Sequence, residues 1–225
     1  MFRDYLVQQH GVESTKIAYL PQYAAAQFDA VQTQYLDKAT VDLMFAGNIG
    51  AAQSLLTVLQ AAELLRQEKR LRWHIVGDGS ELEHLKKLAA EKKLDCVIFH
   101  GRRPSEEMPQ YYAMADAMLV TLTADRFISL TLPGKVQTYM AAGKPVIGSG
   151  NGEIPLVINE ARCGFCAPAE DPQGLADAVR QFLQCEDKQQ LGKNARNYYE
   201  KHFTRKMFMD RLEQELQNFA SHTIR

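Results

Sequence analysis

From residue 41 onward, short apolar runs alternate with longer segments in which apolar side chains recur every three or four positions. Residues 41–47, for example, precede a segment in which Leu55, Leu59 and Leu65 share one helical face. Short runs that alternate with helices are typical of parallel strands, which are covered on both faces. The pattern therefore predicts an α/β fold, a Rossmann-like, doubly wound parallel sheet of about six strands with helices on both faces. The expected strands lie in residues 41–47, 71–79, 96–101, 117–122, 144–150 and 164–169.

The first forty residues do not follow this alternation. Residues 2–12 have the spacing of a helix that stops at Gly11, residues 16–22 have the composition of a strand, and residues 23–39 resemble a connector. The alternating core is therefore expected over residues 40–203. Residues 204–225 are expected to form one further helix with an apolar stripe. The stripe consists of Phe208, Leu212, Leu216 and Phe219.

The charges of the chain are nearly balanced. Its 26 lysines and arginines offset 27 acidic residues, so no global field attracts nucleic acid or an anionic bilayer. No apolar stretch has the length of a membrane span, and no signal-peptide pattern occurs. We expect a cytoplasmic protein, with peripheral contact at the inner face of a membrane left open.

Cysteines and histidines give no metal or redox signature. The 225 residues include four cysteines, too few for a disulfide-stapled fold, and this favours a reducing compartment. Cys163 and Cys166 have the spacing of a redox pair but lack the surrounding pattern, so we interpret them as small residues around a buried strand. The histidines show no metal spacing and are expected at the surface or in packing. No metal is expected.

Residues 132–150 contain a short helix with clear start and stop signals. Pro133 and Gly134 suit its first turn, and Gly143 suits a left-handed stop. One face carries apolar side chains, whereas Lys135, Thr138 and Ala142 lie on the other. A cation and a hydroxyl near a helix N-terminus suit a diphosphate. The alternative is a surface helix with a solvated lysine.

Other chemistry-bearing residues follow the expected strands, so they should meet at one edge of the sheet. Asp78 is either a base or part of a turn, and Glu153 either caps a helix or touches a bound sugar. The glycines do not form a dinucleotide fingerprint, because Leu82 stands where the third glycine is required. The residues at this edge are Gly47, Gly50, Gly77, Gly79, Arg102, Arg103, Gly150 and Gly152.

These segments resemble the C-terminal half of a family 4 (group 1) glycosyltransferase of the GT-B fold, in the branch that serves bacterial polysaccharide biosynthesis. The resemblance covers roughly residues 15–205, and its most specific part is YMAAGKPVI, residues 139–147. It is also carried by FAGNIGAAQSL, WHIVGDGSELEHLKKLA, VIFHGRRPSEEMPQYYAMADAMLVTL and CGFCAPAEDPQGLADAV.

The resemblance implies a retaining, hexosyltransferase-type enzyme that uses a nucleotide diphosphate sugar, here expected to be a UDP-sugar, without a cofactor or an essential metal. Lys135 matches the lysine that neutralises the diphosphate, and it is the expected catalytic residue. Residues 101–103 would lie near the base. The expected donor-binding residues are Gly47, Asn48, Ile49, Gly50, Gly101, Arg102, Arg103, Gly134, Lys135 and Thr138.

The chain departs from the family pattern at two places. Many relatives carry paired glutamates eight positions apart, and here those positions hold Leu130 and Thr138. The second glutamate normally grips the ribose hydroxyls, for which Thr138 offers one hydroxyl. The first loop also lacks the usual arginine and lysine, and offers Asn48 and Gln53 in their place.

The resemblance further implies an N-terminal domain that binds a sugar or lipid-linked acceptor. Residues 1–39 would be the tail of that domain plus a linker, and residues 204–225 would pack on it or self-associate. The leading hypothesis is a donor-binding domain that is inactive alone because it lacks an acceptor site. A second is a degenerate, non-catalytic domain that serves as a binding or assembly subunit. A third, another enzyme on this architecture such as a GT-B epimerase or a dehydrogenase, is disfavoured by length and by the missing fingerprint.

Overall fold

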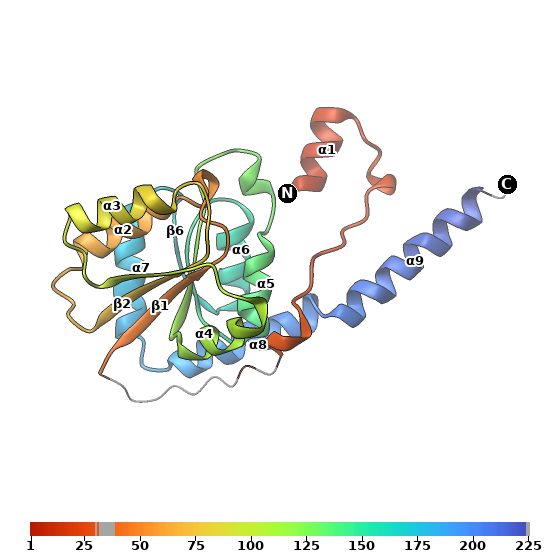
Figure 1. The fold of residues 1–225 in the computed structure, drawn as a ribbon. Helices are drawn as coiled ribbons and strands as arrows, with labels where there is room; N and C mark the ends of the chain where they lie inside the picture. Colours follow the sequence, from red (N-terminus) through yellow and green to blue (C-terminus); the bar gives the residue numbers. More distant parts are fainter. Residues whose placement is uncertain (30, 32–38, 224–225) are drawn as a thin grey trace.

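The core of the chain is a six-stranded parallel sheet in the order β3-β2-β1-β4-β5-β6 (Figure 1). The computed structural model describes residues 1–29, 31 and 39–223, with side chains described to residue 220. All five neighbouring strand pairs are parallel. This confirms the predicted sheet. The strands are β1 (Val41–Ala46), β2 (Leu71–Val76), β3 (Val97–Gly101), β4 (Ala117–Thr121), β5 (Val146–Ser149) and β6 (Gly164–Ala167).

Helices cover both faces of the sheet because alternate side chains of each strand point to opposite sides. Leu43 and Phe45 of β1 join one buried cluster, under α2 (Leu55–Leu64), α3 (Leu82–Glu91) and α7 (Pro172–Gln184). Met44 and Ala46 join the other cluster. That cluster lies under α4 (Met108–Met114), α5 (Gly134–Ala141), α6 (Glu153–Ala161) and α8 (Lys188–His202), so the sheet is doubly wound as predicted.

The winding reverses between β1 and β4. Strands β2 and β3 extend the sheet on one side of β1, while β4, β5 and β6 extend it on the other. The pairing of β1 with β4 spans only Leu43 and Met44 on β1, so the two strands separate toward their carboxyl ends. Ligands of doubly wound sheets bind in the crevice at such a reversal point. The crevice therefore begins beside Ala46, the last residue of β1.

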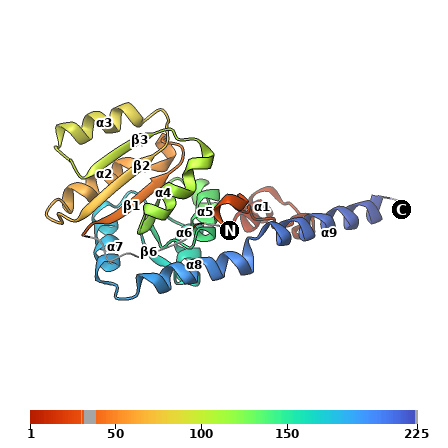
Figure 2. The same ribbon diagram turned by 60° about the horizontal axis from the view of Figure 1, so that its bottom comes forward.

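Two helices project from the sheet domain (Figures 1 and 2): α1 (Phe2–His10) and α9 (Arg205–Thr223). Helix α1 ends at Gly11 in the left-handed conformation, as predicted. Residues 16–22 do not form the predicted strand. A strand needs a hydrogen-bonded neighbouring strand, and no strand of the described chain pairs with this segment.

Helix α9 contacts the N-terminal segment at its beginning and is exposed farther along. The Phe208 ring packs against Tyr23 at 5.0 Å between centroids, and the Arg211 guanidinium donates to the Tyr19 carbonyl at 2.9 Å. Leu216 and Phe219 are 59% and 73% exposed. Within the described residues, no helix is long and apolar enough to cross a membrane.

Candidate functional site

The loops that leave the first three strands stack on one another at the carboxyl edge of the sheet. The Gly47 amide donates to the Val76 carbonyl at 3.0 Å, and the Gly77 amide donates to the Gly101 carbonyl at 2.9 Å. One step farther out, the Ile49 amide donates to the Asp78 carbonyl at 2.8 Å. These backbone hydrogen bonds continue the sheet ladder beyond the strands and hold the loops as one rigid rim.

Glycine is required at two positions of this rim. A Cβ on Gly77 would lie 1.8 Å from the Gly47 carbonyl oxygen, and one on Gly79 would lie 2.2 Å from the Ile49 carbonyl oxygen. The φ angles of Gly77 and Gly79 are +146° and +156°, which other residues rarely adopt. The glycines that the sequence places after β2 are therefore there for close backbone approach.

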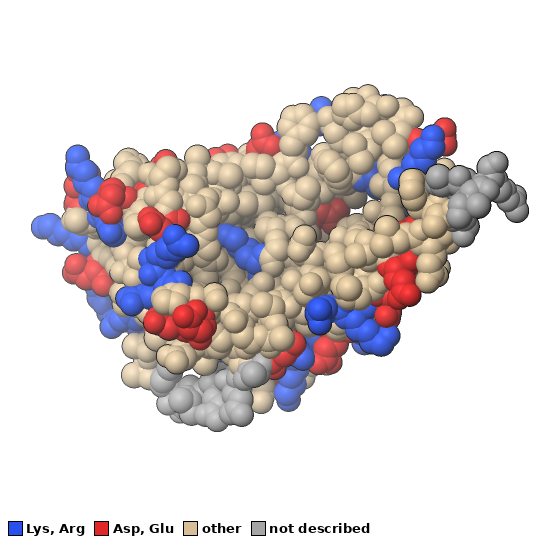
Figure 3. All heavy atoms as spheres, turned by 45° about the vertical axis from the view of Figure 1, so that its right-hand side comes forward, with Lys and Arg blue, Asp and Glu red and all other residues tan. Residues whose placement is uncertain are grey.

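A pocket of about 720 Å³ opens between these loops and α4. Four of the predicted site residues line it: Gly47, Asn48, Arg102 and Arg103. Figure 3 shows this side of the molecule hollowed, with both basic and acidic side chains in and around the hollow. The other lining residues are Ala46, Val76, Gly77, Asp78, Gly79, Met108 and Tyr112.

The side chain of Lys135 reaches the same edge from α5. Its ammonium nitrogen is buried, lies 3.9 Å from the centre of the Phe45 ring, and has no hydrogen-bond partner among the described residues. A Cβ on Gly47 would lie 3.2 Å from it. Burial lowers the pKa of Lys135 to about 8. A cation held over an aromatic face, with its donors unused, is ready to receive an anion.

The position of Lys135 follows from how α5 is anchored. The Tyr139 hydroxyl donates to the Ala46 carbonyl at 3.0 Å and accepts from the Ala46 amide at 3.2 Å, which joins α5 to the end of β1. Gly143 ends the helix with φ +63°, as predicted. Ala142 was expected on the open face but is buried, because α8 also packs against this helix. The open face therefore holds Lys135 and Thr138 but not Ala142.

The family model described as "Glycosyl transferases group 1" matches residues 40–185, which contain this pocket and all of α5. The chain belongs to the group 1 glycosyltransferases.

Curated relatives and solved structures agree with this assignment. This glycosyltransferase chain is 32% identical to the probable glycosyltransferase WbjE of Pseudomonas aeruginosa over 142 residues, 62% of this chain and 35% of the relative. It is 32% identical over 137 residues to the amylovoran biosynthesis glycosyltransferase AmsK of Erwinia amylovora, 60% of this chain and 34% of the relative. The chain thus spans about a third of the length of these relatives.

Among solved structures, the C-terminal domain of the group 1 glycosyltransferase LpcC from Francisella tularensis matches with a TM-score of 0.62 at 18% identity, over 81% of this chain and 96% of that domain. Anabaena HepE, solved with UDP and glucose, matches with a TM-score of 0.71 at 19% identity, over 96% of this chain and 60% of HepE. The sheet domain therefore has the fold of the C-terminal half of a GT-B glycosyltransferase.

The positions that hold paired glutamates in many relatives have different chemistry in this glycosyltransferase. The Thr138 hydroxyl donates to the Gly134 carbonyl at 3.1 Å, so its proton is used within α5 while its oxygen can still accept. Leu130 ends a short 3-10 turn and offers no polar atom on its side chain. Gly134, the first residue of α5, contributes its backbone only.

Polar groups of the first loop also hydrogen-bond to one another. The Gln53 side-chain oxygen accepts from the Gly50 amide at 3.1 Å and from the Asn48 side chain at 3.2 Å. Ile49 is fully buried, so it offers backbone and no side chain to the pocket. Gly101, with φ +70°, turns the chain out of β3 toward the two arginines. Of the predicted residues, Lys135, Arg102 and Arg103 are therefore those that bring charge to the edge.

Asp78 accepts from the Gly79 amide at 2.8 Å within its turn, as the turn interpretation predicts, and it also lines the pocket. Glu153, the first residue of α6, makes no cap hydrogen bond in the described chain and instead accepts from the Met1 ammonium at 3.0 Å. Burial raises the pKa of both Cys163 and Cys166 to about 12, so neither is a reactive thiolate. Among the described residues, no three histidine, cysteine or acidic side chains gather as a metal site.

One positioning residue was missed by sequence reasoning. Lys144 is 1% exposed, and its ammonium donates to the Ala115 carbonyl at 2.9 Å and to the Ala113 carbonyl at 3.3 Å. It thus caps the carboxyl end of α4, the helix that brings Met108 and Tyr112 to the pocket. A lysine beside a glycine stop looks solvated in a sequence, so no local signal indicated this role.

Proposed function

We propose that this chain is the donor-binding domain of a retaining, hexosyltransferase-type enzyme of polysaccharide or glycoconjugate assembly. The observation that carries the proposal is the buried ammonium of Lys135, which has no hydrogen-bond partner in the described chain and lies against Gly47 at the reversal point of the sheet. An unpaired buried cation is costly unless an anion compensates it. A nucleotide diphosphate supplies that anion.

In the proposed complex, the diphosphate lies between the Gly47–Gly50 backbone and the first turn of α5. Lys135 and the N-terminal end of α5 neutralise it, and they act most strongly when the sugar departs and charge builds on the leaving group. The nucleoside enters the pocket bordered by Arg102 and Arg103. UDP is the proposed nucleotide, which the UDP-bound structure of the relative HepE supports.

The acceptor is proposed to bind residues outside this chain. The curated relatives are about three times as long as the matched segment, since that segment covers 35% and 34% of the first two. We propose that residues 1–39 and 204–225 contact this further part, which would hold a sugar or lipid-linked acceptor at the cytoplasmic side of a membrane. Without an acceptor held against the donor, the chain alone should bind a nucleotide sugar but transfer nothing.

The test is calorimetric titration of the chain with UDP, GDP and ADP, on the natural protein and on Lys135→Met. We expect saturable binding of UDP and a loss of about tenfold or more in Lys135→Met, because a charge-assisted contact contributes about 1.5–3 kcal/mol. The matched control is Lys87→Met, which removes a lysine that is 78% exposed on α3. Equal UDP affinity in Lys135→Met and the natural chain would refute the assigned role.

A second function, a non-catalytic assembly subunit, is favoured by one observation. Leu130 and Thr138 offer no carboxylate where many relatives carry two, and the Thr138 proton is already committed to Gly134. Under this alternative, none of the three nucleotides binds, and the chain forms a stable complex with another protein. The same titration therefore separates the two functions.

A further inference from the structure

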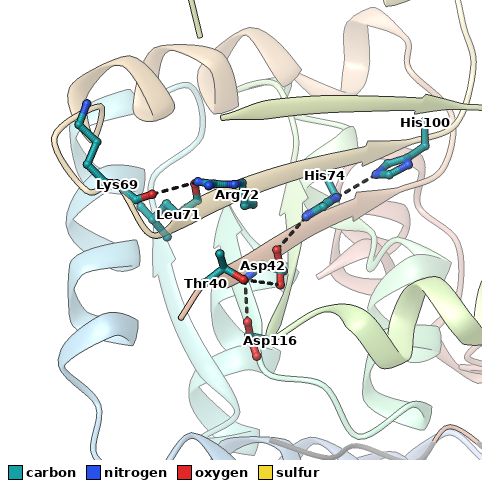
Figure 4. A network of polar contacts seen from close by, with 8 residues as sticks. All are labelled: Thr40, Asp42, Lys69, Leu71, Arg72, His74, His100 and Asp116. Carbon is teal, nitrogen blue, oxygen red and sulfur yellow. Dashed lines mark hydrogen bonds and ion pairs between the residues drawn. The ribbon is translucent and has the colours of Figure 1, made fainter. Parts of the chain in front are cut away.

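A line of polar side chains, buried at Asp42 and His74 and half-buried at His100, runs from the start of β1 toward the pocket (Figure 4). The His74 Nε2 atom lies 2.9 Å from the Asp42 carboxylate, and the His74 Nδ1 atom lies 2.9 Å from the His100 Nε2 atom. Asp42 and His74 are only 8% and 6% exposed. Sequence reasoning treated these histidines as surface or packing residues, and the structure instead pairs two of them across adjacent strands.

The line continues to the rim of the pocket through ring contacts. The His100 ring meets the Tyr111 ring of α4 edge to face, with 5.2 Å between centroids. The Arg103 guanidinium lies over the Tyr111 ring, 5.8 Å from its centre. Arg103 lines the pocket, so Tyr111 connects His100 to a charge at the pocket rim.

The hydrogen bonds of the pair assign the protons. The Asp42 carboxylate accepts from the His74 Nε2–H group, so the His74 Nδ1 atom is free to accept from the His100 Nε2–H group. One added proton still leaves an N–H donor facing a ring-nitrogen acceptor between the two rings, so both hydrogen bonds of the pair are kept. A second added proton places two N–H groups face to face and breaks the bond between the rings.

The surroundings oppose that second proton. Burial, the neighbouring His74 and the Arg103 cation each lower the pKa of His100. The groups that face the pair are Asp42 from β1, Tyr111 from α4 and Arg103 from the loop after β3. Behind them, Asp116 accepts from the Asp42 amide at 2.7 Å, and the Thr40 hydroxyl contacts the Asp42 carboxylate at 3.4 Å.

We propose that His100 is a positioning residue of the nucleotide site. Bonded to His74 and held by Asp42, it fixes Tyr111 and thereby the Arg103 guanidinium at the rim of the pocket. A second proton on the histidine pair releases Arg103, so that nucleotide affinity falls in acid. This inference rests on the proposed nucleotide-binding function of the pocket, and adds a proton-sensitive control of it.

The first experiment titrates UDP from about pH 8 down to about pH 4, because the lowered pKa of His100 places the second proton of the pair below the usual range of an imidazole. His100→Phe keeps a ring against Tyr111 but neither bonds to His74 nor takes a proton. We expect it to bind UDP about two- to fivefold more weakly than the natural chain at the upper pH, because the hydrogen bond that positions the ring is lost, and to lose part of the decline in acid. Tyr111→Leu should bind UDP about two- to fivefold more weakly at the upper pH, because it loses the exposed cation–π contact with Arg103.

The control is His84→Gln, which removes an exposed imidazole on α3 and should leave the whole profile unchanged. The terminal phosphate of UDP also takes up a proton in this range. The proposal is therefore tested by the difference in pH dependence of UDP affinity between His100→Phe and the natural chain. An identical acid decline in His100→Phe and the natural chain would overturn the proposal. A purely structural role of His100 would lower the thermal stability of His100→Phe without changing the shape of its pH profile.

A second readout needs no ligand. The nitrogen-resolved NMR signal of the Arg103 side chain should broaden as the pH of the natural chain falls, and should not respond in His100→Phe. If UDP fails to bind while this response is present, the proposed function fails but the positioning role stands. If UDP binds and the Arg103 signal is the same in both proteins at every pH, the positioning role is refuted alone.

Discussion

Tyr139 and Ala46 exchange two hydrogen bonds at the point where β1 separates from β4. The phenol donates to the Ala46 carbonyl at 3.0 Å and accepts from the Ala46 amide at 3.2 Å, so one side chain satisfies both peptide groups that lack a strand neighbour there. Burial also raises the pKa of Tyr139. The crevice can open beside β1 because this hydroxyl replaces the missing strand.

We therefore expect Tyr139→Phe to lower the free energy of unfolding by about 1–3 kcal/mol, the cost of leaving buried backbone groups unpaired. Urea unfolding measures it. Tyr19→Phe is the control, since Tyr19 is 61% exposed, and it should change the free energy of unfolding by less than about 0.5 kcal/mol. Equal stability of the two variants would mean that water satisfies Ala46 as well as the phenol does.

The lowered pKa of Lys135 predicts that nucleotide binding is linked to proton uptake. Near its pKa of about 8, part of the free protein carries a neutral amine, whereas a bound diphosphate favours the ammonium and raises the pKa. Affinity should be highest below this pH and fall up to about tenfold per unit above it. Calorimetry at alkaline pH in buffers of different ionisation enthalpy measures the uptake. Binding by Lys135→Met should show none, and residual uptake there would assign it to another group.

The stacked loops predict a sharp contrast between two glycines. Gly77→Ala should lower the free energy of unfolding by about 3 kcal/mol or more, because its Cβ would overlap the Gly47 carbonyl at a φ of +146°. Gly134→Ala is the control: a Cβ there meets nothing within 4 Å, and the residue begins α5. It should be neutral or stabilise by up to about 1 kcal/mol. Thermal unfolding of both variants tests the contrast, and similar losses would contradict the loop packing.

Thr138→Glu should restore a grip on ribose. A carboxylate at this position of α5 would accept hydrogen bonds from sugar hydroxyls, which Thr138 does with one oxygen at most while its proton binds Gly134. We expect UDP to bind about tenfold more tightly, since hydrogen bonds to charged groups contribute about 1.5–3 kcal/mol. Thr138→Gln is the uncharged control and should gain less. A gain in affinity for UDP but not for uracil alone would place the effect at the ribose or phosphate. No gain in affinity would mean that the ribose does not lie near Thr138.

The sheet, its winding and the rim of glycines and arginines were predictable because apolar period and turn residues are local properties of the chain. The strand expected at residues 16–22 was wrong because strand formation requires a neighbour that no local pattern reveals. Ala142 was misplaced for a similar reason, since α8 covers it from a distant part of the sequence.

Within the site, the importance of Lys135 was expected, but its surroundings were not. The contact with Phe45 and the anchoring of α5 by Tyr139 join residues 90 or more positions apart. The His74–His100 pair was hidden because each histidine, alone on an apolar strand, looks like a packing residue. Neighbouring strands in parallel sheets are joined by long crossovers, so such pairs cannot be read from spacing.

The position of Lys135 over Phe45 also affects the entropy of binding. When a ligand immobilises a solvent-exposed lysine, the lost rotamer entropy costs about 2 kcal/mol of binding free energy. Here that freedom is already lost when the chain folds, because the ammonium is packed against the ring and the Gly47 backbone before any anion arrives. The ligand-free domain is therefore less stable than its core alone would make it, and the diphosphate that relieves the buried charge should also raise its melting temperature.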